Sequence, residues 1–363
     1  MKVSISWLAI GFLSFIQFQS MAASENFIPA HHPYIQYFGR WDLSDTCHAR
    51  YSWPGVYVQT EFNGTSIKIR LTDNTNYFNV YIDGALHHVF HGTNYGETEY
   101  VLAENLSYSK HTLILSRRNI TFDTVYSFEG FVLDSGATLL PPPPKPARKI
   151  EFIGDSFTAA ESNEAKAPSL PWEARFPVTN IDKGFAVDIA RHFHAQYTTT
   201  CRSGSGMACD WRGDTNVTIP KIFDRALMES KKPLWDFKQW VPNVAVICLG
   251  LNDHSGLHDS VGNISVKKSA FFKKTYHQFI QTLRDVYPDV KIVAVAAFPE
   301  WVRTNVKQIV DEETASGHND IFYTTFDEYP GGYVANGHPT VETHQKMADQ
   351  LIQAMESFHL FSN

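Results

Sequence analysis

Four short blocks of residues suited to acyl-transfer chemistry follow one another in the C-terminal part of this 363-residue sequence. The first, Gly154-Asp155-Ser156, ends a buried strand pattern and delivers Ser156 to the carboxyl edge of a sheet, where α/β proteins bind their ligands. A helix that begins there would point its positive dipole end at Ser156 and stabilise an alkoxide or a nearby anion. The other blocks are Arg202-Ser203-Gly204-Ser205-Gly206, Gly250-Leu251-Asn252-Asp253 and Gly337-His338-Pro339.

Each block also has a simpler structural explanation. Two of them contain common helix-capping residues, Asp155 and Ser156 in one and Asn252 and Asp253 in the other. The glycine-rich block around Gly204 would form a tight turn. His338 would be a capping or surface histidine, and His344 competes for its role. Because His344 falls inside the final helical pattern, farther from the strand edge, we expect it to be structural.

The elements that must position these blocks alternate between strand and helix from residue 147 onward. Two runs, 244–249 and 292–297, are almost continuously apolar, as strands covered on both faces are. Apolar residues recur at helical spacing over 270–287 and 340–359. We therefore predict a three-layer α/β domain with a parallel, flavodoxin-like sheet. Its expected strands are Lys149–Gly154, Gln196–Cys201, Val244–Gly250, Val290–Ala297 and Ile321–Thr325.

The preceding residues, 24–140, have an all-β pattern. Short strand-like runs separated by turn signals favour a β-sandwich of jelly-roll type. Asn63-Gly64 predicts a tight hairpin turn, and Asp83-Gly84 ends another strand before the chain pairs back. The proline-rich residues 141–146 predict a stiff linker, because four consecutive prolines fit neither a helix nor a central strand. The expected units are a sandwich (24–140), this linker (141–146) and the α/β domain (147–363).

The N-terminus predicts export. A lysine, an apolar run over 7–18 and small residues before Ser24 resemble a secretory signal peptide over residues 1–23, whereas an uncleaved anchor is disfavoured by the short run. The glycosylation sequons fit an exported protein, and they lie at Asn63, Asn105, Asn119, Asn216 and Asn263. Cys201 and Cys209 flank the glycine-rich loop and are the expected disulfide, while Cys248 is the expected buried thiol.

Charge and spacing exclude several kinds of partner. The net charge of −7 argues against nucleic acid, since phosphate binding needs a basic face. The sequence has no Cys-x-x-Cys pair, which disfavours a structural zinc site, and we expect neither a metal nor another cofactor. After residue 23 the sequence contains no run long and apolar enough to cross a bilayer. A secreted monomer without a membrane partner is the expectation.

In this order, the four blocks resemble those of SGNH (GDSL-type) esterases, and the β-sandwich in front makes the chain similar to family 2 carbohydrate esterases. The resemblance implies that Ser156 is the nucleophile and His338 the general base. It also implies an oxyanion hole made by the N–H groups of Ser156 and Gly204 and the side-chain amide of Asn252. Pro339 at the first helical position would fix His338 just before the last helix.

The sequence departs from the family pattern beside the histidine. Most SGNH enzymes carry an aspartate three residues before it, where this chain has Ala335, and family 2 esterases often carry one two residues before it, where this chain has Asn336. Asn336 or a backbone carbonyl would then accept the imidazole N–H, which predicts a Ser–His dyad with the risk of weakened activity.

Acetylated polysaccharide, such as xylan or glucomannan, is the substrate that the resemblance implies, with Trp211 and Trp301 as candidates for stacking on sugar rings. Two alternatives stay open. One is an esterase of other small acyl esters, and the other is a carbohydrate-binding protein that kept the fold without catalysis.

Overall fold

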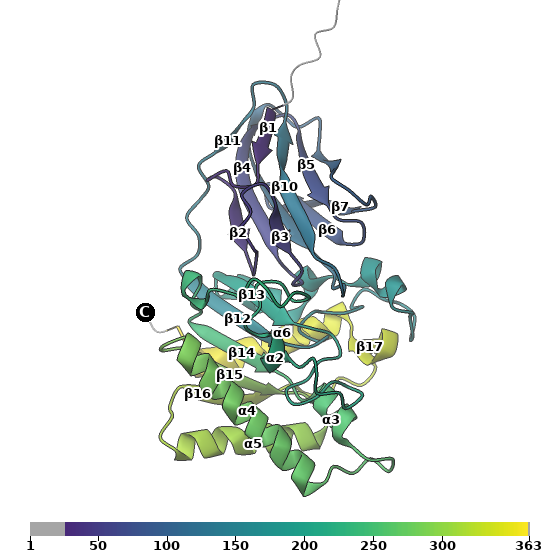
Figure 1. Ribbon diagram of the computed structural model, residues 1–363, viewed down its shortest axis with the longest axis vertical. Helices are drawn as coiled ribbons and strands as arrows, with labels where there is room; N and C mark the ends of the chain where they lie inside the picture. The colour runs from purple at the N-terminus through teal and green to yellow at the C-terminus, as the bar shows by residue number, and fades with distance from the viewer. Residues whose placement is uncertain (1–25, 362–363) are drawn as a thin grey trace, which may run out of the picture.

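The computed structural model describes residues 26–361, which form a β-sandwich stacked on a layered α/β unit (Figure 1). The extended segment 141–147 joins the two. The predicted signal segment, 1–23, lies outside the described residues. None of the helices within 26–361 combines the length and the apolar character needed to cross a bilayer.

The sandwich consists of two antiparallel sheets that enclose an apolar core. One sheet has the order β1-β10-β5-β8 with β3 beside β10, and the other has the order β11-β4-β9-β6-β7 with β2 beside β4. The strands are β1 (Asn26–Pro29), β2 (Gln36–Phe38), β3 (Ala49–Tyr51), β4 (Tyr57–Gly64), β5 (Ile67–Thr72), β6 (Tyr77–Ile82), β7 (Ala85–His91), β8 (Thr98–Ala103), β9 (Ser109–Arg117), β10 (Tyr126–Leu133) and β11 (Thr138–Leu140).

One of the two predicted turns in the sandwich is correct. Asp83 and Gly84 both have positive φ and join β6 directly to β7 as a hairpin. The hairpin predicted at Asn63-Gly64 is wrong, because both residues belong to β4 and the next strand, β5, lies in the other sheet. The chain crosses between the sheets there, and the Asp134 carboxylate accepts the next two backbone N–H groups.

The α/β unit contains a five-stranded parallel sheet with the order β13-β12-β14-β15-β16, which is the flavodoxin-like order. Each of its strands overlaps a predicted one, and two of its interior strands, Val244–Cys248 and Lys291–Ala296, are buried and almost continuously apolar. α1 and α6 pack together, and α4 packs against α5 in a separate layer (Figure 1). The strands are β12 (Arg148–Gly154), β13 (Ala195–Cys201), β14 (Val244–Cys248), β15 (Lys291–Ala296) and β16 (Ile321–Thr325), and β17 (Tyr333–Val334) pairs separately with β18 (His338–Pro339). The helices are α1 (Phe185–His192), α2 (Ile219–Ile222), α3 (Leu251–Leu257), α4 (Val266–Val286), α5 (Glu300–Ala315) and α6 (Val341–Ser357), with short 3₁₀ turns η1 (Glu173–Val178), η2 (Ile181–Lys183), η3 (Phe237–Gln239) and η4 (Ala335–Gly337).

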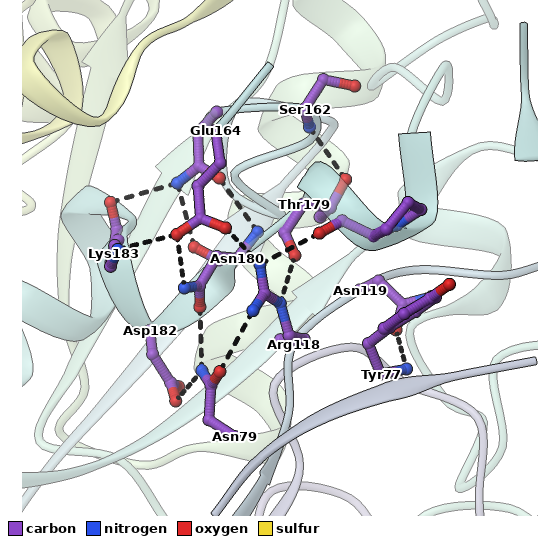
Figure 2. Close-up of polar contacts among 12 residues, drawn as sticks. Tyr77, Asn79, Arg118, Asn119, Ser162, Glu164, Thr179, Asn180, Asp182 and Lys183 are labelled. Atoms are coloured by element: carbon purple, nitrogen blue, oxygen red, sulfur yellow. Dashed lines mark hydrogen bonds and ion pairs between the residues drawn. The ribbon is translucent and has the colours of Figure 1, made fainter. Parts of the chain in front are cut away.

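A buried polar network joins the sandwich to the α/β unit (Figure 2). Arg118, which directly follows β9, donates to the carbonyl of Thr179 at 2.9 Å and forms an ion pair with Glu164. Asn79 of β6 donates to Asp182 at 2.7 Å. A buried arginine with this many partners is costly to disturb, because each partner loses a hydrogen bond that water cannot replace. The sandwich therefore holds the segment 161–183 of the α/β unit in place.

Two expectations about modification fail at particular residues. All four cysteines are free thiols, so the predicted Cys201–Cys209 disulfide is absent. The loop between them is instead shaped by a buried aspartate, described below. The sequon at Asn119 is fully buried, and its side-chain oxygen accepts the backbone N–H of Tyr77 at 2.8 Å. A glycan at Asn119 is incompatible with this fold.

Candidate active site

All four sequence blocks contribute to one cleft at the carboxyl ends of β12, β13 and β14. It has a volume of about 940 Å³ and is lined by Ser156, Gly204, Asn252 and His338, among others. In a parallel sheet of this order, β13 is added on one side of β12 and β14 on the other, so the strand order reverses there and the crevice opens between β12 and β14. The topology thus brings together side chains that lie far apart in the sequence.

Ser156 follows β12 by two residues and is 9% exposed. The helix predicted to begin there does not form. Ala159 N–H bonds to Asp155 O as in a first helical turn, but Ala160 and Ser162 have φ values of 51° and 57°. These left-handed residues bend the chain into a compact turn that ends before residue 165. The turn presents Ser156 to the cleft without an extended helix dipole behind it.

Two backbone donors for an oxyanion are available. Within residues 26–361, the N–H groups of Ser156 and Gly204 donate to no protein acceptor. Gly204 has a φ of 78°, a conformation that glycine adopts without the steric cost that a Cβ brings. A Cβ at this position would also lie 3.0 Å from Cδ1 of Trp211. Both the backbone conformation and the neighbouring indole explain the glycine.

Asn252 lies in the first turn of α3 and points its amide group at the same region. Its Nδ2 donates to Asp155 Oδ2 at 2.9 Å and to Ser205 O at 3.1 Å. Both amide hydrogens are therefore engaged in the structure. Donation to an oxyanion would replace the bond to Ser205 O, while the shorter bond to Asp155 keeps the side chain oriented.

Two buried carboxylates support this part of the cleft. Burial, together with the nearby charges of Asp253 and Glu161, raises the pKa of Asp155 to about 7. Burial also raises the pKa of Asp253 to about 6. Asp253 accepts the backbone N–H groups of Met207 and Ala208 at 2.8 and 2.6 Å and that of Cys209 at 3.1 Å. These bonds fix the glycine-rich loop and take the part that a disulfide was expected to play.

His338 is held by the chain immediately before it. Its Nδ1 lies 2.8 Å from Ala335 O, and because a carbonyl can only accept, Nδ1 carries the proton and Nε2 is left as the base. Pro339 is not the first helical residue as predicted, because His338 and Pro339 form β18 and α6 begins at Val341 behind the cap Thr340.

Asn336 lines the cleft but does not orient the imidazole through its side chain. Its Oδ1 accepts the N–H of Leu170 at 3.1 Å, and its Nδ2 donates to Ser169 Oγ at 3.3 Å. Of the two acceptors anticipated for the imidazole, the backbone carbonyl is therefore the one in place. His344 is fully buried, its pKa is lowered to about 3 by burial, and it accepts the N–H of Phe185, as a structural histidine does.

Aromatic side chains form much of the cleft wall. Trp211 is 52% exposed beside Gly204. Phe122, from the loop that follows β9 of the sandwich, stacks on Trp172 with ring centroids 4.7 Å apart. Trp301 is absent from the cleft lining; its indole packs on Phe272 of the core and donates to a serine of α4. Sequence reasoning missed Phe122 and Trp172, because nothing local links a sandwich loop to the catalytic edge.

Glu161 and Arg175 also line the cleft and were not anticipated. The Glu161 carboxylate is 2% exposed and accepts from Arg175 at 2.6 Å. Its Oε1 lies 3.9 Å from His338 Nε2. No sequence signal identifies this pair, since the three residues meet only after the turn and the last loop have folded. Within residues 26–361, no three His, Cys, Asp or Glu side chains gather in a way that could hold a metal ion.

Similarity to known proteins covers most of the chain. Residues 37–143 match the family model described as carbohydrate esterase 2 N-terminal. The chain is 31% identical over 328 residues to cellulase/esterase CelE of Acetivibrio thermocellus, covering 88% of this chain and 39% of that protein. This chain is a relative of the family 2 carbohydrate esterases. The chain thus spans well under half the length of CelE, and the similarity is confined to that part of the longer protein.

Two further relatives cover most of their own length. An acetylxylan esterase / glucomannan deacetylase of Cellvibrio japonicus is 27% identical over 313 residues, covering 84% of this chain and 85% of that protein. The structure of a family 2 carbohydrate esterase from Clostridium thermocellum in complex with cellohexaose is 28% identical, with a TM-score of 0.81. It covers 89% of this chain and 98% of that chain. The relationship to family 2 carbohydrate esterases therefore extends over both units.

Proposed function

We propose that this protein is a secreted serine esterase that removes acetyl groups from plant cell-wall polysaccharide, such as xylan or glucomannan. The observation that carries the proposal is the meeting, in one cleft, of a serine, a histidine with a free Nε2, and two unengaged backbone N–H groups. Ester hydrolysis through an acyl-enzyme needs these three components and no metal.

The proposed reaction proceeds in two halves. Ser156 Oγ attacks the acetyl carbonyl while His338 Nε2 takes its proton, and the oxyanion is stabilised by the N–H groups of Ser156 and Gly204 and by Asn252 once its amide leaves Ser205 O. His338 then returns the proton to the departing sugar oxygen, which leaves an acetyl group on Ser156. Water, activated by His338, releases acetate by the reverse sequence.

The dyad is completed by a neutral orienting group. Ala335 O fixes the tautomer and direction of His338, as a carboxylate would, but adds no full negative charge to stabilise the imidazolium. This supports the proposed Ser–His dyad and predicts that electrostatic help must come from elsewhere. The aromatic wall of Phe122, Trp172 and Trp211 supports a sugar substrate, since pyranose faces are apolar. We propose that the protein acts as a monomer.

The direct test is acetate release from acetylated xylan, acetylated glucomannan and a chromogenic acetate ester, measured for the wild type, Ser156→Ala and His338→Ala. We expect both variants to lose at least about 1000-fold in kcat. A matched control is Ser230→Ala, because the hydroxyl of Ser230 lies outside the cleft and donates to a backbone carbonyl there. Unchanged turnover in Ser156→Ala would remove this serine as the nucleophile.

A second function, carbohydrate binding without catalysis, is favoured by two observations. Both hydrogens of the Asn252 amide are already engaged, and a carboxylate partner on the Nδ1 side of His338 is missing. Wild-type protein that binds the polysaccharides but releases no acetate from any of the three substrates would support this alternative.

A further inference from the structure

The imidazole of His338 faces a neutral group on one side and a carboxylate on the other. Nδ1 donates to Ala335 O at 2.8 Å. On the opposite side, Glu161 Oε1 lies 3.9 Å from Nε2, the nitrogen that would exchange the proton with Ser156. The side chain of Glu161 is 2% exposed and that of His338 is 12% exposed, so water screens this pair only weakly.

The chain accepts backbone strain to place Glu161 there. The residues on either side, Ala160 and Ser162, both adopt left-handed φ values although neither is glycine. A residue with a Cβ rarely adopts this conformation, which persists only where surrounding bonds enforce it. Ser162 N–H donates to Thr179 Oγ1 at 2.9 Å, and Glu161 N–H donates to Ser156 O at 3.0 Å. The same turn therefore fixes the serine and the carboxylate relative to each other.

We propose that Glu161 is a positioning residue that stabilises the imidazolium form of His338 from its Nε2 side, in place of the aspartate that the sequence lacks. This inference rests on the proposed esterase function. During each half-reaction the proton moves from Ser156 or water to Nε2 and on to the leaving oxygen, and Glu161 takes no proton. At 3.9 Å the carboxylate is beyond hydrogen-bond distance, so Nε2 keeps its lone pair for Ser156.

Arg175 sets the strength of the effect. Its guanidinium donates to Glu161 Oε1 at 2.6 Å and to Leu170 O at 3.0 Å, which anchors the carboxylate and offsets part of its charge. Glu161 therefore stabilises the imidazolium less than an isolated carboxylate would. Substitution of Glu161 by glutamine removes the anion and leaves the arginine, so that the imidazolium then faces an unbalanced positive charge.

Other titratable groups near the histidine include Asp155, whose pKa is raised by burial to about 7, and His344, whose pKa is lowered by burial to about 3. Asp123, Arg212 and His254 also line the cleft and are the same in wild type and variant. His344 stays neutral from pH 4 upward. Asp155 is bonded to Asn252 and to the N–H of Phe157 and is common to wild type and variant. The charge of Glu161 also contributes to the raised pKa of Asp155, so the shift of the acid limb is assigned to His338 only where it persists in an Asp155→Asn background.

The experiment is a measurement of kcat and kcat/KM for a chromogenic acetate ester between pH 4 and 9, with wild type, Glu161→Gln and Glu161→Asp. We expect Glu161→Gln to lower kcat about tenfold at neutral pH with KM nearly unchanged. Because the imidazolium is less stable without the anion, the acid limb of the profile moves to lower pH. Glu161→Asp, which keeps the charge, should recover part of kcat and move the acid limb back toward its wild-type position.

Glu313→Gln is the matched control. Glu313 likewise lies between an arginine and a histidine, at 2.6 Å from Arg284 and 2.6 Å from His277, but on α5 outside the cleft. It should leave kcat and the pH profile unchanged while costing comparable stability in thermal melting. If Glu161→Gln does not fold, the double variant Glu161→Gln/Arg175→Gln, which leaves no unpaired cation, must show the same shift of the acid limb.

A variant at Glu161 with wild-type kcat and an unmoved acid limb, or with a higher kcat, would overturn the inference. This outcome differs from failure of the proposed function, in which the wild type is inactive or Ser156→Ala retains activity. An active wild type, an inactive Ser156→Ala and an unaffected Glu161→Gln would reject only the role of Glu161.

Discussion

Substitution of Gly204 by alanine tests how the oxyanion hole is built. The residue has a φ of 78°, where alanine costs about 1 to 2 kcal/mol, and its added Cβ would lie 3.0 Å from Cδ1 of Trp211. To relieve the backbone strain and the close contact, either the peptide of residue 204 must rotate or the indole of Trp211 must move. Rotation turns the Gly204 N–H away from the oxyanion, and loss of one such donor lowers kcat by about 100-fold to 1000-fold.

The assay compares kcat for a chromogenic acetate ester with the free energy of unfolding in urea. Gly262 provides the control, because it has a φ of 88° but no heavy atom within 4 Å of a Cβ built on it, and it lies outside the cleft. Gly262→Ala should lose about the same stability, 1 to 2 kcal/mol, with unchanged kcat. Gly204→Ala with kcat within threefold of wild type, at a similar loss of stability, would refute the assignment of this N–H to the oxyanion hole.

Three further predictions concern the supporting structure. The pKa of Asp155 is raised from 3.8 to about 7 in the folded state, so the contribution of Asp155 to stability is present below pH 4 and falls by about 4 kcal/mol as the pH rises to 7. Asp155→Asn should flatten the fall of melting temperature over this pH range, and an unchanged slope would contradict the raised pKa. Arg118→Ala should lower the free energy of unfolding in urea by about 3 to 5 kcal/mol and lower kcat, because Glu164 and the carbonyl of Thr179 lose a partner. A loss of stability below about 1 kcal/mol would show that the two units do not depend on this contact. Peptide mapping of protein secreted from a glycosylating host should find no glycan at the buried Asn119, and an occupied Asn119 in active protein would contradict the described packing.

The sequence predicts the sheet of the α/β unit well, because central strands buried on both faces form almost continuous apolar runs, as β14 and β15 do. The sequence predicts local structure less well where contacts between distant residues determine the conformation. Asn63-Gly64 is a strong local turn signal, but the pairing of β4 with β9 and β11 keeps both residues in a strand. Cys201 and Cys209 are close in sequence, but Asp253 organises the loop between them.

The candidate site divides in the same way. The blocks containing Ser156, Gly204, Asn252 and His338 converge because each follows a strand end or precedes the last helix, and such positions are visible in the sequence. The position of Glu161 depends instead on a turn with two left-handed residues, which no local propensity predicts. The cleft wall at Phe122 depends on the docking of the sandwich through buried polar groups, which is equally invisible in a single sequence.

The central claim is that Ser156 is a nucleophile activated by His338. The most direct measurement is the rate of covalent labelling by an organophosphonate ester, followed by intact mass and peptide mapping. Labelling of wild-type protein should be stoichiometric and confined to Ser156, absent in Ser156→Ala and slowed at least about 100-fold in His338→Ala. Labelling at another residue, or an equal rate in His338→Ala, would contradict the account.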